Sequence, residues 1–176
     1  MLSPRTRYNR RMKLSTQEEY GLRCLLHLAR VPGGQSLTIP EISKAEGLSV
    51  PNVAKLMRLL RMGGMVQSAR GQAGGYTLAR PPEKIILSDV LDLLGGQFFS
   101  SKFCERHAGR QNVCNHAVDC SLRVLWNTIQ SVLHEVLGKI TLRDLLCSEH
   151  QMADLLACRA PEILAVVQSA RPIHTN

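Results

Sequence analysis

The residues with the clearest capacity for chemistry are three cysteines in a segment without helical or strand periodicity. Nine residues separate Cys104 from Cys114, and five separate Cys114 from Cys120. Thiolates are soft ligands that suit iron-sulfur clusters and zinc. Structural zinc sites usually contain a pair of cysteines about two to four residues apart, and no such pair occurs here. An iron-sulfur cluster with a further ligand from elsewhere is one interpretation; a redox-active thiol pair and plain loop cysteines remain open.

The other three cysteines favour less specialised roles. Cys24 falls on the apolar side of a predicted helix, and Cys147 follows two leucines, so both are expected to be small core residues. Cys158 lies in a C-terminal segment, 149–176, which is predicted to be a tail. An even number of cysteines also suggests disulfides, but the N-terminus is arginine-rich and lacks an apolar signal segment. We therefore expect a reducing, cytoplasmic setting.

Composition indicates a globular protein with a polyanionic partner. The chain has 176 residues, 44% of them apolar, and 22 Lys and Arg against 14 Asp and Glu, which gives a net charge of +8. This length suits one domain plus an arm. No apolar run approaches the ~20 residues that a membrane-spanning helix needs. Nucleic acid is the expected partner, and no membrane association is predicted.

Two capping boxes and a glycine turn predict a helix-turn-helix. Ser15 and Glu18 mark the start of a first helix, which Pro32-Gly33-Gly34 ends. Thr38 and Glu41 open a short second helix. Gly47 breaks this helix, and Ser49 is predicted to cap a third one that extends to about Met62. Apolar residues recur at core spacing through both segments.

The next segment predicts a β-hairpin, and a hairpin after a helix-turn-helix makes a winged helix. Residues 65–70 and 76–80 have the character of strands, and the glycine-rich segment 71–75 joins them. The start of the third helix and the wing are the expected DNA-binding surfaces. The candidate DNA contacts are Ser49, Asn52, Lys55, Arg58, Arg70, Gln72, Gly74, Gly75 and Arg80. The alternative is that these are ordinary solvated surface residues and structural glycines.

The predicted fold class is mainly α with a small β-hairpin wing, extended by a long dimerisation helix. Apolar residues from Leu122 to Ile140 step by three and one, which predicts an amphipathic helix over about 121–138. The expected organisation is a disordered basic extension at 1–11, a winged helix-turn-helix domain at 12–96, a cysteine-rich loop at 97–120, a dimerisation helix with a last turn at 121–148, and the tail. Trp126 is expected to be a core anchor on the helix stripe.

No motif indicates an enzyme. The chain contains no HExxH, no nucleophile elbow and no phosphate-binding loop before a helix. We expect a binding protein.

The order of these features resembles the iron-sulfur transcription regulators of the IscR, NsrR and RirA family. The resemblance rests on Met12-Lys-Leu-Ser, Glu19-Tyr-Gly-Leu-Arg23, the helix-turn-helix, the wing motif Arg70-Gly-x-x-Gly-Gly-Tyr76, the three cysteines and the long helix. It covers residues 12–148. It implies a homodimer that binds a palindromic operator in double-stranded DNA, with operator affinity set by a 4Fe-4S or 2Fe-2S cluster.

The resemblance also implies a ligand set. The three loop cysteines would be cluster ligands, and the acid at the eighth position from Met12, which is Glu19, would be donated across the dimer. The alternative for Glu19 is a surface ion pair with Arg23, one helical turn later. The first cysteine spacing is longer than is usual in the family, and His107 or His116 could replace Glu19. Arg123 stands where IscR-type members have a ligating histidine, so that ligand set is not expected.

The sequence therefore predicts a transcriptional regulator, a repressor, that senses iron, redox state or nitric oxide through its cluster. The second hypothesis is a cluster-free winged-helix repressor switched by cysteine oxidation or by a small ligand.

Overall fold

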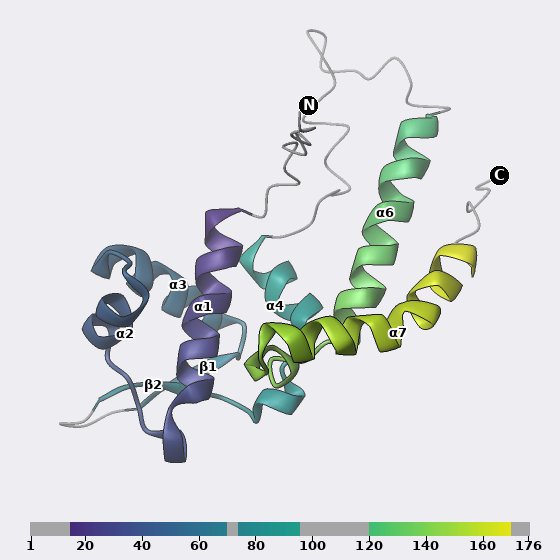
Figure 1. The fold of residues 1–176 in the computed structure, drawn as a ribbon. Helices are drawn as coiled ribbons and strands as arrows, with labels where there is room; N and C mark the ends of the chain where they lie inside the picture. The colour runs from purple at the N-terminus through teal and green to yellow at the C-terminus, as the bar shows by residue number, and fades with distance from the viewer. Residues whose placement is uncertain (1–14, 70–73, 96–119, 170–176) are drawn as a thin grey trace, which may run out of the picture.

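The computed structural model describes residues 15–69, 74–95 and 120–169 (Figure 1). The helices are α1 Thr16–Arg30, α2 Ile39–Glu46, α3 Val50–Met62, α4 Leu87–Leu94, α6 Ser121–Gly138 and α7 Glu149–Ser169. The strands are β1 Val66–Ala69 and β2 Gly75–Leu78, and short 3-10 helices lie at Pro32–Gly34, Pro82–Lys84 and Asp144–Leu146. The mainly helical fold with one hairpin confirms the predicted fold class. The predicted extension at 1–11 and the cysteine loop up to residue 119 lie outside the described residues.

Both predicted capping boxes are present. The Ser15 hydroxyl accepts a hydrogen bond from the Glu18 amide, and the Glu18 carboxylate accepts one from the Ser15 amide at 2.6 Å. Thr38 and Glu41 repeat the arrangement at α2, where the bond from the Thr38 amide to the Glu41 carboxylate is 2.7 Å long. This backbone bond is the main cause of the lowered pKa of Glu41. The carboxylates satisfy amides that a helix start leaves without partners.

Helices α1, α2, α3 and α4 close a shared apolar core. Its fully buried members come from every one of these helices and from β1. They include Cys24, Leu25, Ile42, Val53, Leu56, Met57, Leu60, Val66, Val90 and Leu94. Gly47, between α2 and α3, has a φ of 65°, which allows the sharp turn of the helix-turn-helix.

The hairpin is tied to the helical core by a third extended segment. Strand β1 pairs with β2 in antiparallel register, from Val66 opposite Leu78 to Ala69 opposite Gly75. Leu37 forms a bridge to Tyr76, with N–H···O bonds of 3.0 and 2.8 Å. A Cβ on Gly75 would lie 2.6 Å from the Leu37 carbonyl oxygen, so the close approach requires glycine.

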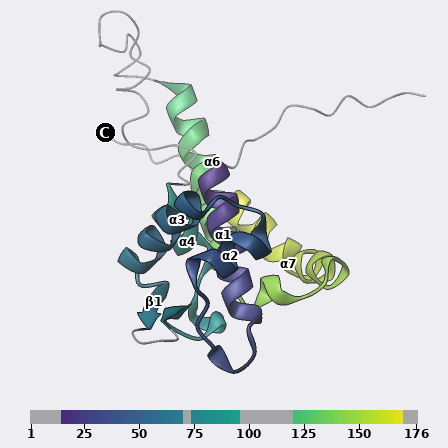
Figure 2. The ribbon, with the colours of Figure 1, turned by 90° about the vertical axis from the view of Figure 1, so that its left-hand side faces the viewer.

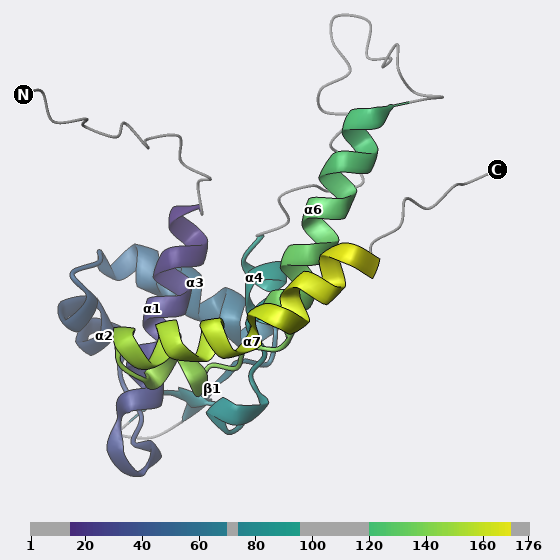
Figure 3. The same cartoon turned by 45° about the vertical axis from the view of Figure 1, so that its right-hand side comes forward.

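Helix α6 is anchored at its C-terminal end only. The Leu87 amide donates to the Ile140 carbonyl at 2.9 Å, and the Leu142 amide donates to the Ile85 carbonyl at 2.8 Å. Leu87, Leu91 and Ile140 form a second small core at this junction. The N-terminal part of α6 extends away from the winged domain (Figure 3). No residue of α6 is buried in the single chain.

The segment predicted to be a tail instead contains the helix α7. Ser148 caps it through reciprocal hydrogen bonds with Gln151, the same device as at α1. Arg159 donates to the Lys139 carbonyl at the end of α6, and Lys139 pairs with Glu162 at 3.4 Å. The apolar residues of α7 are spread around the helix, so sequence periodicity gives a weak signal here, and Pro161 lies inside it. Among the described helices, none has the length and apolarity that a bilayer span requires.

Candidate functional site

Helix α3 presents a polar face opposite its buried face. Val53, Leu56, Met57 and Leu60 are buried, whereas Ser49, Lys55 and Arg58 are exposed and Asn52 is half-buried. Ser49 occupies the N-cap position as predicted, but its side chain makes no capping hydrogen bond. The face therefore offers a hydroxyl, an amide and two cations, which are the groups that read base edges and bind phosphates.

Sequence reasoning missed one residue of this surface. Val50 is 48% exposed at the first position of α3, next to Ser49. An exposed apolar side chain at the start of a recognition helix is suited to contact a thymine methyl group. The sequence signal that could have found it is a valine at the first helical position, directly after the predicted cap residue Ser49.

The wing places its predicted DNA contacts unevenly. Arg70 and Gln72 lie outside the described residues, and Gly74 immediately precedes β2. Gly75 is required by the close approach of the Leu37 backbone, which leaves no room for a side chain. Arg80 is half-buried at the base of the wing; its Nη2 lies 3.3 Å from the Met65 sulfur, and its Nε is buried without a partner among the described residues. The guanidinium of Arg80 thus lies against Met65, and a contact of Arg80 with DNA stays a prediction.

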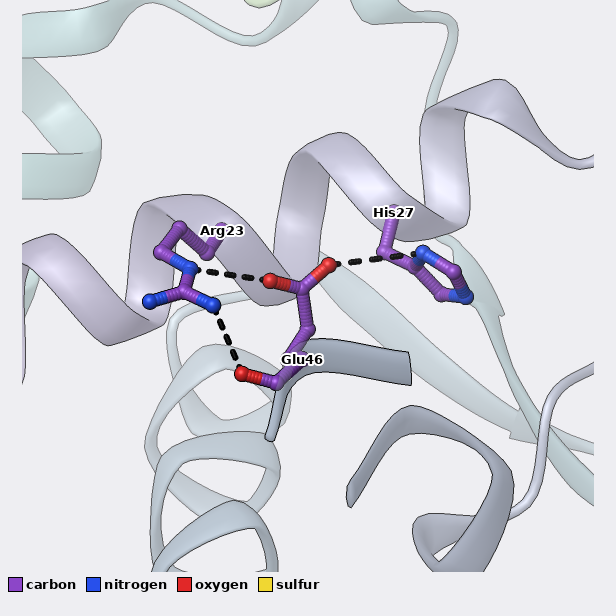
Figure 4. Close-up of polar contacts among 3 residues, drawn as sticks. All are labelled: Arg23, His27 and Glu46. Atoms are coloured by element: carbon purple, nitrogen blue, oxygen red, sulfur yellow. Dashed lines mark hydrogen bonds and ion pairs between the residues drawn. The ribbon is translucent and has the colours of Figure 1, made fainter. Parts of the chain in front are cut away.

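The turn of the helix-turn-helix is held from α1. Glu46, the last residue of α2, accepts from Arg23 Nε at 2.9 Å through Oε2, and its other carboxylate oxygen lies 3.4 Å from His27 Nδ1 (Figure 4). The Glu46 carbonyl accepts a further bond from Arg23 Nη2 at 2.6 Å. The hydrogen bond with Glu46 is the largest cause of the raised pKa of Arg23. Arg23 is thus paired with Glu46, and the predicted alternative pairing with Glu19 is not the contact formed.

Two of the four predicted cluster ligands lie in the described part of the chain. Cys120 is half-buried at the N-cap position of α6, and its thiol is free among the described residues. Glu19 is exposed in the first turn of α1, and its carboxylate accepts no hydrogen bond from a described residue. Cys104 and Cys114 lie outside the described residues.

A single chain does not bring Glu19 and Cys120 into one site. The first turns of α1 and α6 lie toward the same end of the molecule, with α4 between the two helices (Figure 1). Within residues 15–69, 74–95 and 120–169, no three His, Cys, Asp or Glu side chains are grouped to hold a metal ion. The α1 end is nevertheless tied to the start of the loop, because Gln17 Nε2 donates to the Leu94 carbonyl at 2.6 Å.

The three cysteines that are not predicted cluster ligands differ in their surroundings. Cys24 is fully buried in the core, as predicted, and burial raises its pKa to about 11. A thiol with this pKa is protonated at neutral pH and is a poor ligand and nucleophile. Cys147 is half-buried and donates to the Asp144 carbonyl at 2.8 Å, while Cys158 is exposed on α7.

Trp126 is not a core anchor of the single chain. It is 41% exposed, and neighbouring apolar residues of α6 are also exposed: Leu122 by 60%, Val124 by 44% and Leu125 by 49%. The predicted apolar stripe is present, but its two halves differ: Val136, Leu137 and Ile140 pack at the junction with α4, whereas the N-terminal half is exposed.

The likeness to known proteins covers the winged helix and α6. The model of the Rrf2 family, described as iron-dependent transcriptional regulators, matches residues 14–148. The protein rrf2 of Nitratidesulfovibrio vulgaris is 33% identical over 135 residues, which are 77% of this chain and 87% of that protein.

Two solved structures share this fold. The structure of T. potens IscR has 32% sequence identity and a TM-score of 0.60, and covers 77% of this chain and 86% of its own. The structure of CymR of B. subtilis, titled the global cysteine regulator, has 30% identity and a TM-score of 0.58, and covers 77% of this chain and 97% of its own. Helix α7 lies beyond the residues that the family model matches. The chain therefore belongs to the Rrf2 family and is a winged-helix, DNA-binding transcriptional regulator rather than an enzyme.

Proposed function

We propose that this regulator is a homodimeric repressor whose operator affinity is set by an iron-sulfur cluster. The ligands are Cys104, Cys114 and Cys120, with Glu19 from the partner subunit. The observation that carries the proposal is the position of Cys120 directly before α6, whose N-terminal apolar residues are exposed in one chain. A ligand at this position joins the cysteine loop to the dimer helix.

The dimer follows from the exposed face of α6. Leu122, Leu125 and Trp126 are spaced at i, i+3 and i+4 on one side of α6, and all three are exposed, whereas Val136 and Leu137 near its C-terminal end pack against their own chain. A second copy of α6 is the partner that covers this face. Two recognition helices related by a two-fold axis match a palindromic operator.

The available donors fit a cluster in chemistry. A bound cluster would supply a soft-metal link between thiolates that iron loss, oxidation or nitric oxide breaks. The half-buried Cys120 is suited to this role, whereas the Cys24 thiol is held protonated inside the core. The Glu19 carboxylate is exposed, and its charge is a minor cause of the raised pKa of Arg23, behind Glu46.

Helix α1 is the element that transmits the state of the loop to DNA. Gln17 binds the carbonyl of Leu94 at the end of α4, where the chain enters the loop. One face of α1 contributes to the core beneath α3. An ordered loop therefore restrains the first turn of α1, and α1 restrains the recognition helix. A hundredfold change in operator affinity requires about 2.7 kcal/mol of coupling, which the ordering of one loop can supply.

The test of the cofactor is the composition of the protein purified without oxygen. We expect a brown protein with nearly equal iron and acid-labile sulfide per chain. Cys104→Ala, Cys114→Ala and Cys120→Ala should each lose the colour, and Glu19→Gln should weaken retention of iron. Cys158→Ala is the matched control and should keep it, because Cys158 is exposed on α7, outside the matched region. A colourless protein that resists reconstitution and still binds DNA would contradict the proposal.

A cluster-free repressor switched by cysteine oxidation or a small ligand is the second candidate. Its support is the likeness to CymR, 97% of which is covered, at an identity close to that of the IscR structure. Cys114→Ala separates the two candidates: under the second one, the protein loses its response to oxidant without ever having held iron. Either candidate acts on DNA with reduced thiols, so we place the protein in the cytoplasm.

A further inference from the structure

Glu46 connects α1 to the turn that leads into the recognition helix. It is the last residue of α2, and Gly47 follows it in the left-handed conformation. The guanidinium of Arg23 binds both the side chain and the main chain of Glu46, with distances of 2.9 Å to the carboxylate and 2.6 Å to the carbonyl. A planar guanidinium with two such bonds fixes orientation as well as distance.

The remaining oxygen of the carboxylate is also engaged. His27, one helical turn after Arg23, places Nδ1 3.4 Å from Oε1 of Glu46. The Glu46 side chain is only 14% exposed, and the Arg23 guanidinium lies over the Tyr20 ring at 5.6 Å from its centroid. The carboxylate is therefore held from two sides, and the arginine that holds it is itself held in place (Figure 4).

The position of this contact relative to α3 gives it a consequence for DNA. Ser49, the N-cap of α3, lies three residues after Glu46. The intervening turn is closed by hydrogen bonds from the Leu48 amide to the Ser43 carbonyl and from the Ser43 hydroxyl to the Leu48 carbonyl. Apolar packing between α1, α2 and α3 is non-directional, whereas these polar bonds fix the direction in which α3 leaves the turn.

We propose that Arg23, His27 and Glu46 form a positioning site that sets the direction of the recognition helix and so determines how well this regulator distinguishes its operator from other DNA. None of the three is expected to touch DNA. The inference rests on DNA binding by the family and not on the cluster, so it stands or falls separately from the proposed cofactor.

The experiment compares two affinities for each variant. One duplex is selected by the wild-type protein from random sequences, and the other is a shuffled duplex of the same length and composition. Non-specific binding depends on phosphate contacts, and specific binding depends on the placement of α3 against base edges. We expect Glu46→Gln to lower the ratio of specific to non-specific affinity about tenfold, with non-specific affinity unchanged within about twofold.

Further variants separate positioning from folding. Loss of folded protein lowers both affinities by the same factor and leaves their ratio unchanged. Asp144→Asn is the matched control, because it removes the carboxylate that accepts from the Thr141 amide and hydroxyl at 2.8 and 3.0 Å, away from the helix-turn-helix. It should lower thermal stability and keep the ratio.

Coupling between the partners tests the contact itself. Arg23→Gln should reduce the ratio as Glu46→Gln does, and the double variant should be no worse than the more affected single variant, because both substitutions remove the ion pair between the two side chains. His27→Gln should have a smaller effect, since its bond is longer. An unchanged ratio in Glu46→Gln, or additive losses in the double variant, would overturn the inference.

Discussion

The winged helix-turn-helix and the C-terminal arm differ in how they use their apolar residues. Helices α1 to α4 bury theirs in one shared core, whereas α6 leaves Leu122, Leu125 and Trp126 exposed. Figure 2 shows α3 and β1 on the opposite side of α1 and α2 from α7. The first region closes its core within one chain, and the second leaves an apolar surface that the proposed dimer would cover. Reading DNA and assembling the dimer are thus assigned to separate surfaces.

Equivalent leucine truncations in the two regions should give the largest difference. Leu56 is 1% exposed in the core, so Leu56→Ala leaves a cavity and should lower the free energy of unfolding by about 3 kcal/mol. Leu122→Ala removes the same atoms from a surface that is 60% exposed. It should cost under about 0.5 kcal/mol in dilute, monomeric protein. Chemical denaturation at low protein concentration measures both, and equal losses would contradict the division into two regions.

A charge on the α6 face should break the dimer and spare the fold. Leu125→Asp places a carboxylate in the proposed interface, where its desolvation is unfavourable. We expect a monomer in sedimentation, an unchanged circular dichroism spectrum, and an operator affinity lower by about a hundredfold, because the two half-sites are no longer bound together. Ser131→Asp, at another exposed position of α6, is the control. A Leu125→Asp protein that remains dimeric would show that another surface forms the dimer.

The buried thiol of α1 should make stability fall at alkaline pH. The pKa of Cys24 rises from its ordinary 9.0 to about 11 on folding, because burial disfavours the thiolate. Between these values the unfolded chain releases the proton and the folded chain keeps it, so rising pH favours unfolding. Relative to Cys24→Ala, the wild type should lose up to about 2 kcal/mol of unfolding free energy between pH 9 and 11.

Denaturation curves of the two proteins at several pH values provide the test. A constant difference between them across this range would mean that Cys24 is solvated in the folded protein.

Removal of the matching caps of α1 and α7 should have the smallest effects on stability. The loss should spread through the whole domain for α1 and stay local for α7. Ser15→Ala removes the cap of α1, which belongs to the shared core, and should lower global stability by about 1 kcal/mol. Ser148→Ala removes the cap of α7, a peripheral helix, and should speed hydrogen exchange of α7 amides without changing the global midpoint. Hydrogen exchange resolved by segment distinguishes the global effect of Ser15→Ala from the local effect of Ser148→Ala. A lower global stability in Ser148→Ala would show that α7 unfolds together with the core.

The elements that local chemistry specifies were predictable from the sequence. Ser15 with Glu18, Thr38 with Glu41, and Gly47 each mark a helix boundary through side-chain or backbone preferences that do not depend on the rest of the fold. These features placed the recognition helix correctly.

Contacts between segments distant in sequence were not predictable. Nothing in the spacing of Arg23 and Glu46 indicates their pairing, because the fold of α2 onto α1 creates it. The i,i+4 spacing offers Glu19 as the alternative partner of Arg23, and the ion pair that the structure forms is with Glu46 instead. The contact of Arg80 with Met65 likewise depends on the fold of the hairpin. Helix α7 was missed for another reason: Ser148 and Gln151 cap it, but its apolar residues lack a clear helical period.

The central claim is that the state of the cysteine loop sets operator affinity through α1 and α6. The most direct measurement is the affinity of the anaerobically purified protein for its operator before and after removal of iron, at one salt concentration and with dimerisation monitored in parallel. The account predicts a change of about a hundredfold, absent in Cys120→Ala, while both forms remain dimeric. Equal affinities for the iron-loaded and iron-free dimers would contradict it.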